Sequence, residues 1–226
     1  NYELRYAAHP KDAKNYDTAR LREDFLIQNL FVDNEANMVY SMYDRLIVGG
    51  AKPVGETLVL EAIDPLKATH FLSRREIGIF NVGGAGRVKV DGKTFDLDFK
   101  EALYLGCGDR TVSFESVDAA KPAKFYFNSA PAHRNCPDKK VTKADAIVAE
   151  MGSLEGSNHR NINKMLVCQV VETCQLQMGM TELQPGSIWN TMPAHTHSRR
   201  MEAYFYFEIP EGDAICHFMG EPTETR

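Results

Sequence analysis

The chain has 226 residues, 43% of them hydrophobic and 25% charged, so it can bury a full core as one large all-β unit or two small ones. A net charge of −5 argues against binding to the phosphate backbone of a nucleic acid, although a local basic pocket can still bind an acidic small molecule. No apolar run approaches membrane-spanning length and the first residues do not resemble a signal peptide, so no membrane association is predicted.

The first predicted element is a helix near the N-terminus. Asp17 and Thr18 can cap the stretch Ala19–Leu26, which is rich in good helix formers. A second helical turn is expected over residues 143–151, after a charged linker. The rest of the chain has little helical character.

Short strands separated by glycine account for most of the remaining sequence. The dipeptide Asp91-Gly92 is the preferred centre of a two-residue hairpin between two of them. Many short strands with few helices indicate a β-sandwich or β-barrel. The expected strands are residues 38–43, 46–48, 86–90, 94–97, 102–105, 111–114, 124–128, 164–170, 175–183 and 203–209.

A Ser-Arg-Arg sequence occurs twice, starting at Ser73 and at Ser198. Three residues before it both copies have a histidine. One residue before it the second copy has His197 where the first has Leu72. Two related β modules, of which only the second keeps a full set of polar groups, explain this pattern, with chance similarity as the alternative.

The segment around the second copy carries the strongest chemical signal. On an extended chain His195 and His197 point the same way, and a tight turn over residues 198–200 would bring Glu202 back to them. Two imidazoles and a carboxylate are a ligand set for zinc or for ferrous iron with open positions. The alternative is a pair of surface histidines that happens to precede a strand.

Tyrosines follow this acid with strand-like spacing. Tyr204 and Tyr206 share the face of Glu202, while Phe205 and Phe207 face the other side. The tyrosine hydroxyls are candidates for substrate contacts, or else the rings are satisfied within the core.

Three further charged residues are candidates for a site. Arg160 and Lys164 lie just ahead of a predicted strand. They would suit a substrate carboxylate, Arg160 by a bidentate pair and Lys164 as a point charge, although both are equally compatible with a solvated surface. Glu182 lies at the end of an apolar strand, as a general base or as an exposed residue before a turn.

The cysteines form no CxxC pair and no even-numbered framework, which favours a reducing, cytoplasmic compartment. Cys168 and Cys174 lie in apolar, strand-like surroundings, so buried free thiols are favoured over zinc ligands. The five are Cys107, Cys136, Cys168, Cys174 and Cys216.

The sequence resembles a family of known enzymes. The pattern His-x-His-x4-Glu in a β-rich chain is similar to the first metal motif of the cupins, which are small double-stranded β-barrels. Longer runs resemble one bicupin family more closely, the 5-keto-4-deoxyuronate isomerases of pectin breakdown, also called 4-deoxy-L-threo-5-hexosulose-uronate ketol-isomerases. The resemblance covers nearly the whole chain, and the runs that carry it are residues 74–78, 82–86, 122–126, 172–176, 189–193 and 199–202.

This resemblance implies an all-β bicupin fold, with two double-stranded β-helix (jelly-roll) barrels and a few short helices. A degenerate N-terminal cupin barrel is expected over residues 1–135, and a metal-binding C-terminal barrel over residues 136–226. The family has further strands after the position of the last residue here, so we expect this sequence to be part of a longer chain.

The resemblance also implies the metal and its ligands. His195, His197 and Glu202 match three zinc ligands of the family, with one Zn²⁺ per subunit. The family's fourth ligand is a histidine on a later strand, and His217 lies too early in the chain to match it. We therefore expect that ligand beyond residue 226.

The reaction implied is a ketol isomerisation of 5-dehydro-4-deoxy-D-glucuronate to 3-deoxy-D-glycero-2,5-hexodiulosonate. A divalent metal would stabilise an enediolate and a base would carry the proton between carbons. Glu182, Tyr206 and a metal-bound hydroxide are the candidates for that base. Arg160 and Lys164 are the candidates for binding the substrate carboxylate.

Two other functions remain compatible with the residues. A ferrous-iron dioxygenase uses the same ligand types, and a non-catalytic sugar-binding cupin would hold a structural metal. Aromatic, Met-rich strands favour a homo-oligomer, in which the N-terminal barrel would serve assembly.

Overall fold

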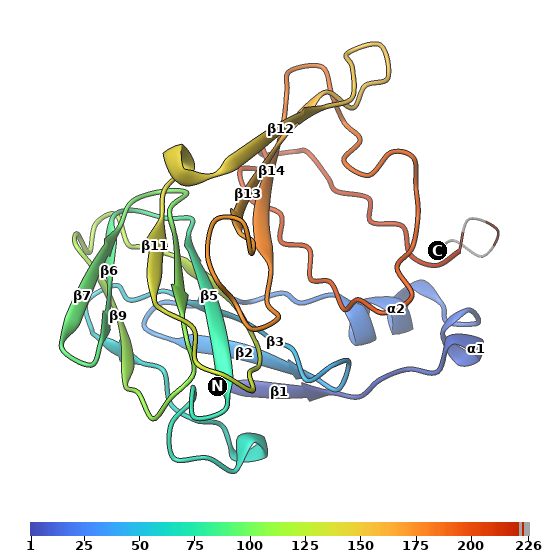
Figure 1. Ribbon diagram of the computed structural model, residues 1–226. Helices are drawn as coiled ribbons and strands as arrows, with labels where there is room; N and C mark the ends of the chain where they lie inside the picture. Colours follow the sequence, from blue (N-terminus) through green and yellow to red (C-terminus); the bar gives the residue numbers. More distant parts are fainter. Residues whose placement is uncertain (222, 224–226) are drawn as a thin grey trace.

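Three β-sheets make up most of the molecule in the computed structural model, which describes residues 1–221 and 223 (Figure 1). The largest has seven strands in the order β1-β2-β3-β10-β5-β8-β11, which span Tyr2–Arg5, Ala36–Ser41, Ile47–Ala51, Phe125–Pro131, Arg75–Asn81, Ala102–Leu105 and Lys139–Val141. A four-stranded sheet has the order β4-β9-β6-β7, spanning Leu58–Val59, Val112–Ser116, Gly86–Val90 and Lys93–Leu97. A three-stranded sheet contains β12, β13 and β14, spanning Ile147–Met151, Arg160–Leu166 and Met178–Leu183.

Helices are few and short. The α-helices are α1 (Pro10–Ala13) and α2 (Thr18–Phe25), and the 3₁₀ turns are η1 (Asp64–Leu66) and η2 (Lys143–Asp145). None of the helices in the described part of the chain has the length and apolarity that a membrane crossing requires. The predicted all-β class with a few short helices is confirmed.

The seven-stranded sheet is the central layer because both of its faces are covered. Every residue of β5 is buried. Ile77 and Ile79 face a core shared with the four-stranded sheet, where Phe114 and Val88 are fully buried. Phe80 faces a second core, shared with the three-stranded sheet. Successive side chains of β5 therefore point alternately into the two cores, because a strand has a two-residue period.

Gly78 of the central sheet lies directly against side chains of the three-stranded sheet. A Cβ atom at this position would lie 2.5 Å from the sulfur of Met178 and 2.7 Å from a methyl group of Leu166. Met178 and Leu166 of the second core thus occupy the space that a side chain at position 78 would need.

Two local predictions are confirmed. The side chain of Asp17 accepts a hydrogen bond from the backbone N–H of Arg20, which caps α2 as expected. Asp91 and Gly92 join β6 to β7 with φ angles of 48° and 81°, as a two-residue hairpin turn of type I′ requires.

Two predicted elements end earlier than expected or change type. The predicted strand 164–170 ends at Leu166, because the backbone N–H groups of Val170 and Val171 both turn back to the carbonyl of Val167. The predicted helical turn 143–151 stops at Asp145, and the residues after it form β12. Its pairing with β13, which starts with Ile147 opposite Lys164, supplies the backbone hydrogen bonds that a helix would have supplied.

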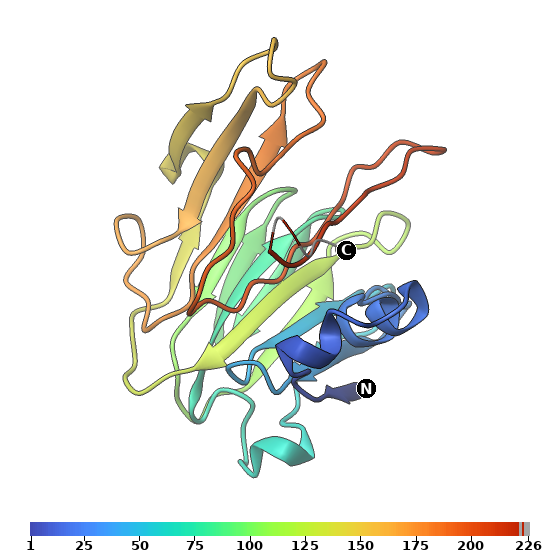
Figure 2. The ribbon, with the colours of Figure 1, turned by 90° about the vertical axis from the view of Figure 1, so that its right-hand side faces the viewer.

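The predicted strand 203–209 is wrong as a paired strand. Within residues 1–221 this segment has no ladder partner, and it ends at Glu208 with φ of 55°. It is nevertheless extended: Phe205 stacks on Tyr126 of the central sheet with ring centroids 4.4 Å apart, and Phe207 meets Phe99 at 6.3 Å. Figure 2 shows this segment, in red, running along the seven-stranded sheet.

The division between residues 135 and 136 stays a prediction. β11 follows that position and pairs with β8 of the central sheet, while β12 begins the three-stranded sheet.

Candidate functional site

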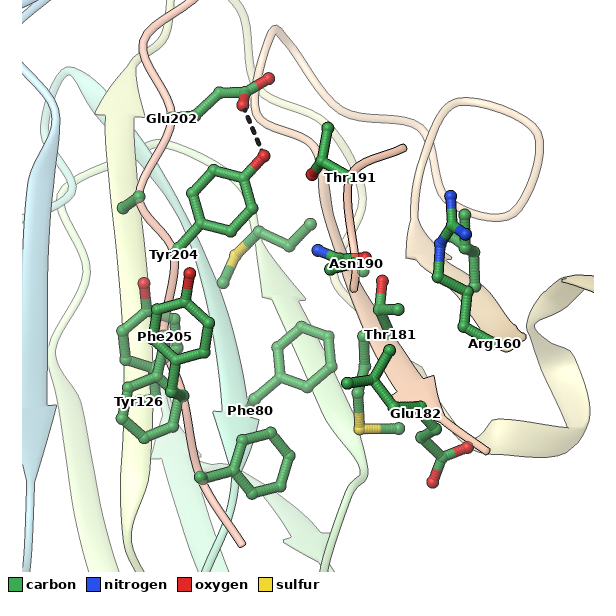
Figure 3. Close-up of a pocket in the computed structure, with 18 of the residues that line it drawn as sticks. Phe80, Tyr126, Arg160, Thr181, Glu182, Asn190, Thr191, Glu202, Tyr204 and Phe205 are labelled. Carbon is green, nitrogen blue, oxygen red and sulfur yellow. Dashed lines mark hydrogen bonds between the residues drawn. The ribbon is translucent and has the colours of Figure 1, made fainter. Parts of the chain in front are cut away.

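A cleft of about 2190 Å³ lies between the central sheet, the three-stranded sheet and the C-terminal segment. Arg160, Ile162 and Lys164 line it from alternate positions of β13. Glu202 and Tyr204 line it from the C-terminal segment (Figure 3). Side chains from two distant parts of the chain therefore face one space.

His195, His197 and Glu202 lie together at this cleft. The two imidazole rings are perpendicular, with centroids 4.9 Å apart, and Nε2 of His197 lies 3.7 Å from Oε1 of Glu202. A turn at residues 198–199 returns the chain toward the histidines, as expected. The carboxylate of Glu202 keeps 31% of its side-chain surface exposed, so it stays accessible to a ligand.

Hydrogen bonds orient these groups. Nδ1 of His195 lies 2.8 Å from the carbonyl oxygen of Pro193, and because a carbonyl only accepts, Nδ1 carries the proton and Nε2 keeps its lone pair free. Arg200 donates to one oxygen of Glu202 at 3.3 Å and the Tyr204 hydroxyl to the other at 3.1 Å. This orientation of an imidazole by a carbonyl is the one that metal-ligating histidines use.

The donor types fit a divalent metal such as Zn²⁺, which takes imidazole nitrogen and carboxylate oxygen. In the arrangement described for residues 1–221 and 223, no three His, Cys, Asp or Glu side chains converge closely enough to hold an ion. The assignment of His195, His197 and Glu202 as ligands stays a prediction, which the free Nε2 of His195 supports.

Tyr204 and Tyr206 lie on the face of Glu202, with ring centroids 6.4 Å apart. Partial burial, followed by the negative charge of Glu202, raises the pKa of Tyr204. Partial burial also raises the pKa of Tyr206, whose hydroxyl lies 2.7 Å from Nδ1 of His217. Both phenols therefore keep their protons at neutral pH, and because Tyr204 donates its single proton to Glu202, its oxygen is left as an acceptor for a ligand in the cleft.

Glu182 lies in an ionic network at the other end of the cleft. Its carboxylate contacts Lys143 at 2.6 Å and Lys100 at 3.1 Å, and Asn163 donates to it at 3.2 Å. Burial alone would raise the pKa of Glu182, but these three donors together lower it. In Figure 3 this carboxylate points away from Glu202.

Arg160 is buried in the wall that faces Glu202 (Figure 3). One of its terminal nitrogens donates to the carbonyl of Asn158 at 2.8 Å, but its Nε is buried with no partner among the described residues. An unsatisfied guanidinium N–H beside a cleft suits an anionic ligand. Lys164 also lines the cleft and is exposed.

Three residues were not identified as site residues from the sequence: Asn190 and Thr191, which line the cleft, and His217, which contacts the lining residue Tyr206. Asn190 and Thr191 lie between Arg160 and Tyr204 in Figure 3, and their only signal is their place in a run shared with the isomerase family. His217 meets Tyr206 because the chain reverses after Pro210, where Asp213 donates to the Pro210 carbonyl. No spacing in the sequence indicated that reversal.

Comparison with known proteins gives consistent results. The KduI/IolB family matches residues 25–225. The chain is 78% identical to 4-deoxy-L-threo-5-hexosulose-uronate ketol-isomerase 1 of Bacteroides thetaiotaomicron, over all of this chain and 81% of that protein. It is 75% identical to the ketol-isomerase of the same name from Bacteroides fragilis, with the same coverage, and 58% identical to that of Formosa agariphila, over 100% of this chain and 80% of that protein.

Proposed function

Because the chain belongs to the KduI/IolB family, we propose that it is an intramolecular oxidoreductase that converts 5-dehydro-4-deoxy-D-glucuronate to 3-deoxy-D-glycero-2,5-hexodiulosonate. The observation that carries the proposal is the 78% identity to a ketol-isomerase over the whole chain. The cleft supports it, because a cationic wall at Arg160 faces polar groups at Glu202 and Tyr204. A small sugar acid has both a carboxylate and hydroxyls to match these walls.

Arg160 is the proposed partner of the substrate carboxylate. One terminal nitrogen of Arg160 donates to the Asn158 carbonyl, and the other is neither buried nor hydrogen-bonded within the described chain, so an incoming carboxylate could bind it by a charge-assisted bond. Lys164, four residues further along β13 and on the same face, adds a second positive charge. This end of the substrate would thus be fixed away from Glu202.

The carbonyl shift requires a proton to leave the hydroxyl-bearing carbon and to return to the neighbouring aldehyde carbon. Tyr206 is the proposed carrier, because its hydroxyl lies 2.7 Å from His217, whose ring nitrogen can accept and return a proton. Glu182 is the alternative, although its lysine partners lower its pKa and weaken it as a base. Tyr206→Phe should then reduce kcat by about 10²-fold and Glu182→Gln much less.

We further propose that His195, His197 and Glu202 bind Zn²⁺. When bound, zinc would act as a Lewis acid that stabilises negative charge developing on the substrate oxygens. The hydrogen bond from Tyr204 holds the Glu202 carboxylate in place, and the Pro193 carbonyl fixes the tautomer of His195. These contacts would restrict the orientation of His195 and Glu202 toward an ion.

Cytoplasmic location and homo-oligomer formation belong to the same proposal. All five cysteines are free thiols, in keeping with a reducing compartment.

Ile147, Val148 and Met151 expose apolar side chains on the edge strand β12, a surface suited to self-association. Light scattering would detect the oligomer, and a monomer at all concentrations would contradict it.

The deciding experiment is to incubate the protein with 5-dehydro-4-deoxy-D-glucuronate and to follow the products by NMR, with and without a chelator. Formation of the 2,5-diketo acid, lost on chelation and restored by zinc, is the expected result. No turnover by metal-loaded protein would overturn the isomerase. Oxygen uptake would then indicate a ferrous dioxygenase, and binding without turnover a sugar-binding cupin.

A further inference from the structure

A cysteine and a histidine lie in contact outside the lining of the cleft. Sγ of Cys174 lies 3.1 Å from Nδ1 of His133, which is hydrogen-bond distance for sulfur and nitrogen. Cys174 is a free thiol of intermediate exposure and the His133 residue is exposed, so small molecules can reach both. The proposed isomerase function uses neither side chain.

The backbone of His133 adds a second contact to the same sulfur. Its N–H donates to Sγ at 3.4 Å. A donor directed at sulfur favours the thiolate over the thiol, since a thiolate is the stronger acceptor. The imidazole and the backbone N–H thus both suit a sulfur that gives up its proton.

The surrounding chain holds Cys174 in this position. Its backbone N–H donates to the buried carboxylate of Glu76 at 2.7 Å, and the next two N–H groups, of Gln175 and Leu176, donate to the same carboxylate. These bonds also offset the negative charge of Glu76, which would otherwise oppose a thiolate nearby. The neighbouring Arg134 is paired with Glu172.

The other cysteines lack this combination. Cys136 is buried and its sulfur is hydrogen-bonded to the Tyr104 side chain, whereas Cys168 is exposed, contrary to the burial expected from the sequence. Burial raises the pKa of the Cys107 thiol, which lowers its thiolate fraction at neutral pH. These residues serve as internal references for Cys174.

We propose that Cys174 and His133 form a reactive thiol–imidazole pair, a modification site for small electrophiles and peroxides. Nδ1 of His133 takes the thiol proton, and the thiolate attacks one oxygen of a peroxide such as H₂O₂. An S–O bond forms as the O–O bond breaks, and the departing hydroxide takes the proton back from the imidazolium as water. Sulfur is oxidised by two electrons to sulfenic acid while the peroxide is reduced.

The test measures cysteine labelling in the native protein. Limiting N-ethylmaleimide is added at pH 7, the reaction is quenched at intervals, and peptide mass spectrometry gives a rate for each cysteine. Cys174 should react about tenfold faster than Cys107 and Cys168. A parallel incubation with H₂O₂ and dimedone should trap sulfenic acid at Cys174 first.

Two variants test whether His133 causes the fast reaction of Cys174. His133→Gln keeps a polar side chain but removes the base, so Cys174 should slow to the rate of Cys168 while Cys168 itself is unchanged. His9→Gln, the same change at the start of α1, is the matched control and should leave Cys174 fast. Equal wild-type rates at Cys174 and Cys107 would overturn the pair whatever the variants do, as would a fast Cys174 in a folded His133→Gln protein.

Discussion

The two Ser-Arg-Arg segments share a sequence pattern but lie in opposite environments. In the first, Arg75 and Glu76 are buried, and Arg75 donates to Ser129 and to the carbonyl of Arg45 inside the molecule. In the second, the Arg200 side chain is 60% exposed, and Glu202 borders the cleft. The same local sequence pattern therefore forms buried structural contacts in the first segment and a candidate ligand site in the second.

The difference is clearest in how each carboxylate uses its oxygens. A carboxylate has about four acceptor positions. Glu76 fills four: the Tyr104 hydroxyl and the Cys174 N–H donate to one oxygen, and the N–H groups of Gln175 and Leu176 to the other. Burial and this hydrogen bond raise the pKa of Tyr104, so its hydroxyl remains a donor.

Glu202 accepts from only Arg200 and Tyr204 within the described residues, so acceptor capacity remains for a ligand. A saturated carboxylate joins parts of a fold, whereas an unsaturated one at a cleft remains free to bind. Counting acceptors thus separates the two roles where sequence similarity does not.

The largest expected effect comes from Glu76. Glu76→Gln replaces an acceptor oxygen by an N–H₂ group that faces donors, and should lower the free energy of unfolding by about 3 kcal/mol. Glu202→Gln should change it by less than about 0.5 kcal/mol. Urea denaturation measures the free energy of unfolding of both variants. Equal losses would contradict the different roles assigned to Glu76 and Glu202.

Activity should respond in the opposite way. Glu202→Gln and His195→Ala should each lose bound zinc and reduce kcat by about 10²-fold or more, because charge in the transition state is no longer stabilised. Metal analysis and product NMR measure the two losses together. His9→Ala, at the start of α1, is the control and should keep both. A metal-free His195→Ala protein with full activity would contradict the assignment.

The two segments also differ two residues after the glutamate: Gly78 follows Glu76, whereas Tyr204 follows Glu202. Gly78→Ala should cost about 2 kcal/mol, since the new methyl group would meet Met178 and Leu166. Gly55→Ala is the matched control, because no atom lies within 4 Å of a Cβ there. Thermal unfolding of the two variants measures the difference. Similar stabilities would show that Met178 and Leu166 can move to accommodate the new methyl group.

Glu182 should give the smallest effect, with a distinct pH dependence. Its folded-state pKa lies below the ordinary 4.5, so its contribution to stability is present above that pH and is lost as pH falls through the folded value. Glu182→Gln should cost about 1 kcal/mol at pH 7, and the difference from wild type should shrink below pH 4.5. Urea midpoints across pH 3–7, with exposed Glu155→Gln as control, test this; a pH-independent gap would contradict it.

Three predictions that depended on neighbouring residues were confirmed. Asp17 caps α2, Asp91-Gly92 turns between β6 and β7, and the aromatic residues of 204–207 alternate as expected. Each depends on the conformational preferences of a few consecutive residues. The tyrosines and phenylalanines separate onto two faces even without a paired strand.

Predictions that depended on distant partners were less complete. The predicted strand 175–183 begins only at Met178, because the N–H groups of residues 174–176 donate to Glu76 instead of to a neighbouring strand. The sequence identified the candidate metal ligands and Arg160 as candidate site residues. It did not indicate that His217 meets Tyr206 or that His133 meets Cys174.

By itself, the amino-acid sequence determined the all-β class, the turn positions, the alternation of faces and the residue types of the candidate site. Tertiary structure decided which acid is saturated, which lysines hold Glu182 and which wall Arg160 occupies. The physical reason is that propensity and periodicity act over a few residues, whereas burial and hydrogen-bond satisfaction depend on groups as far apart as Glu76 and Leu176.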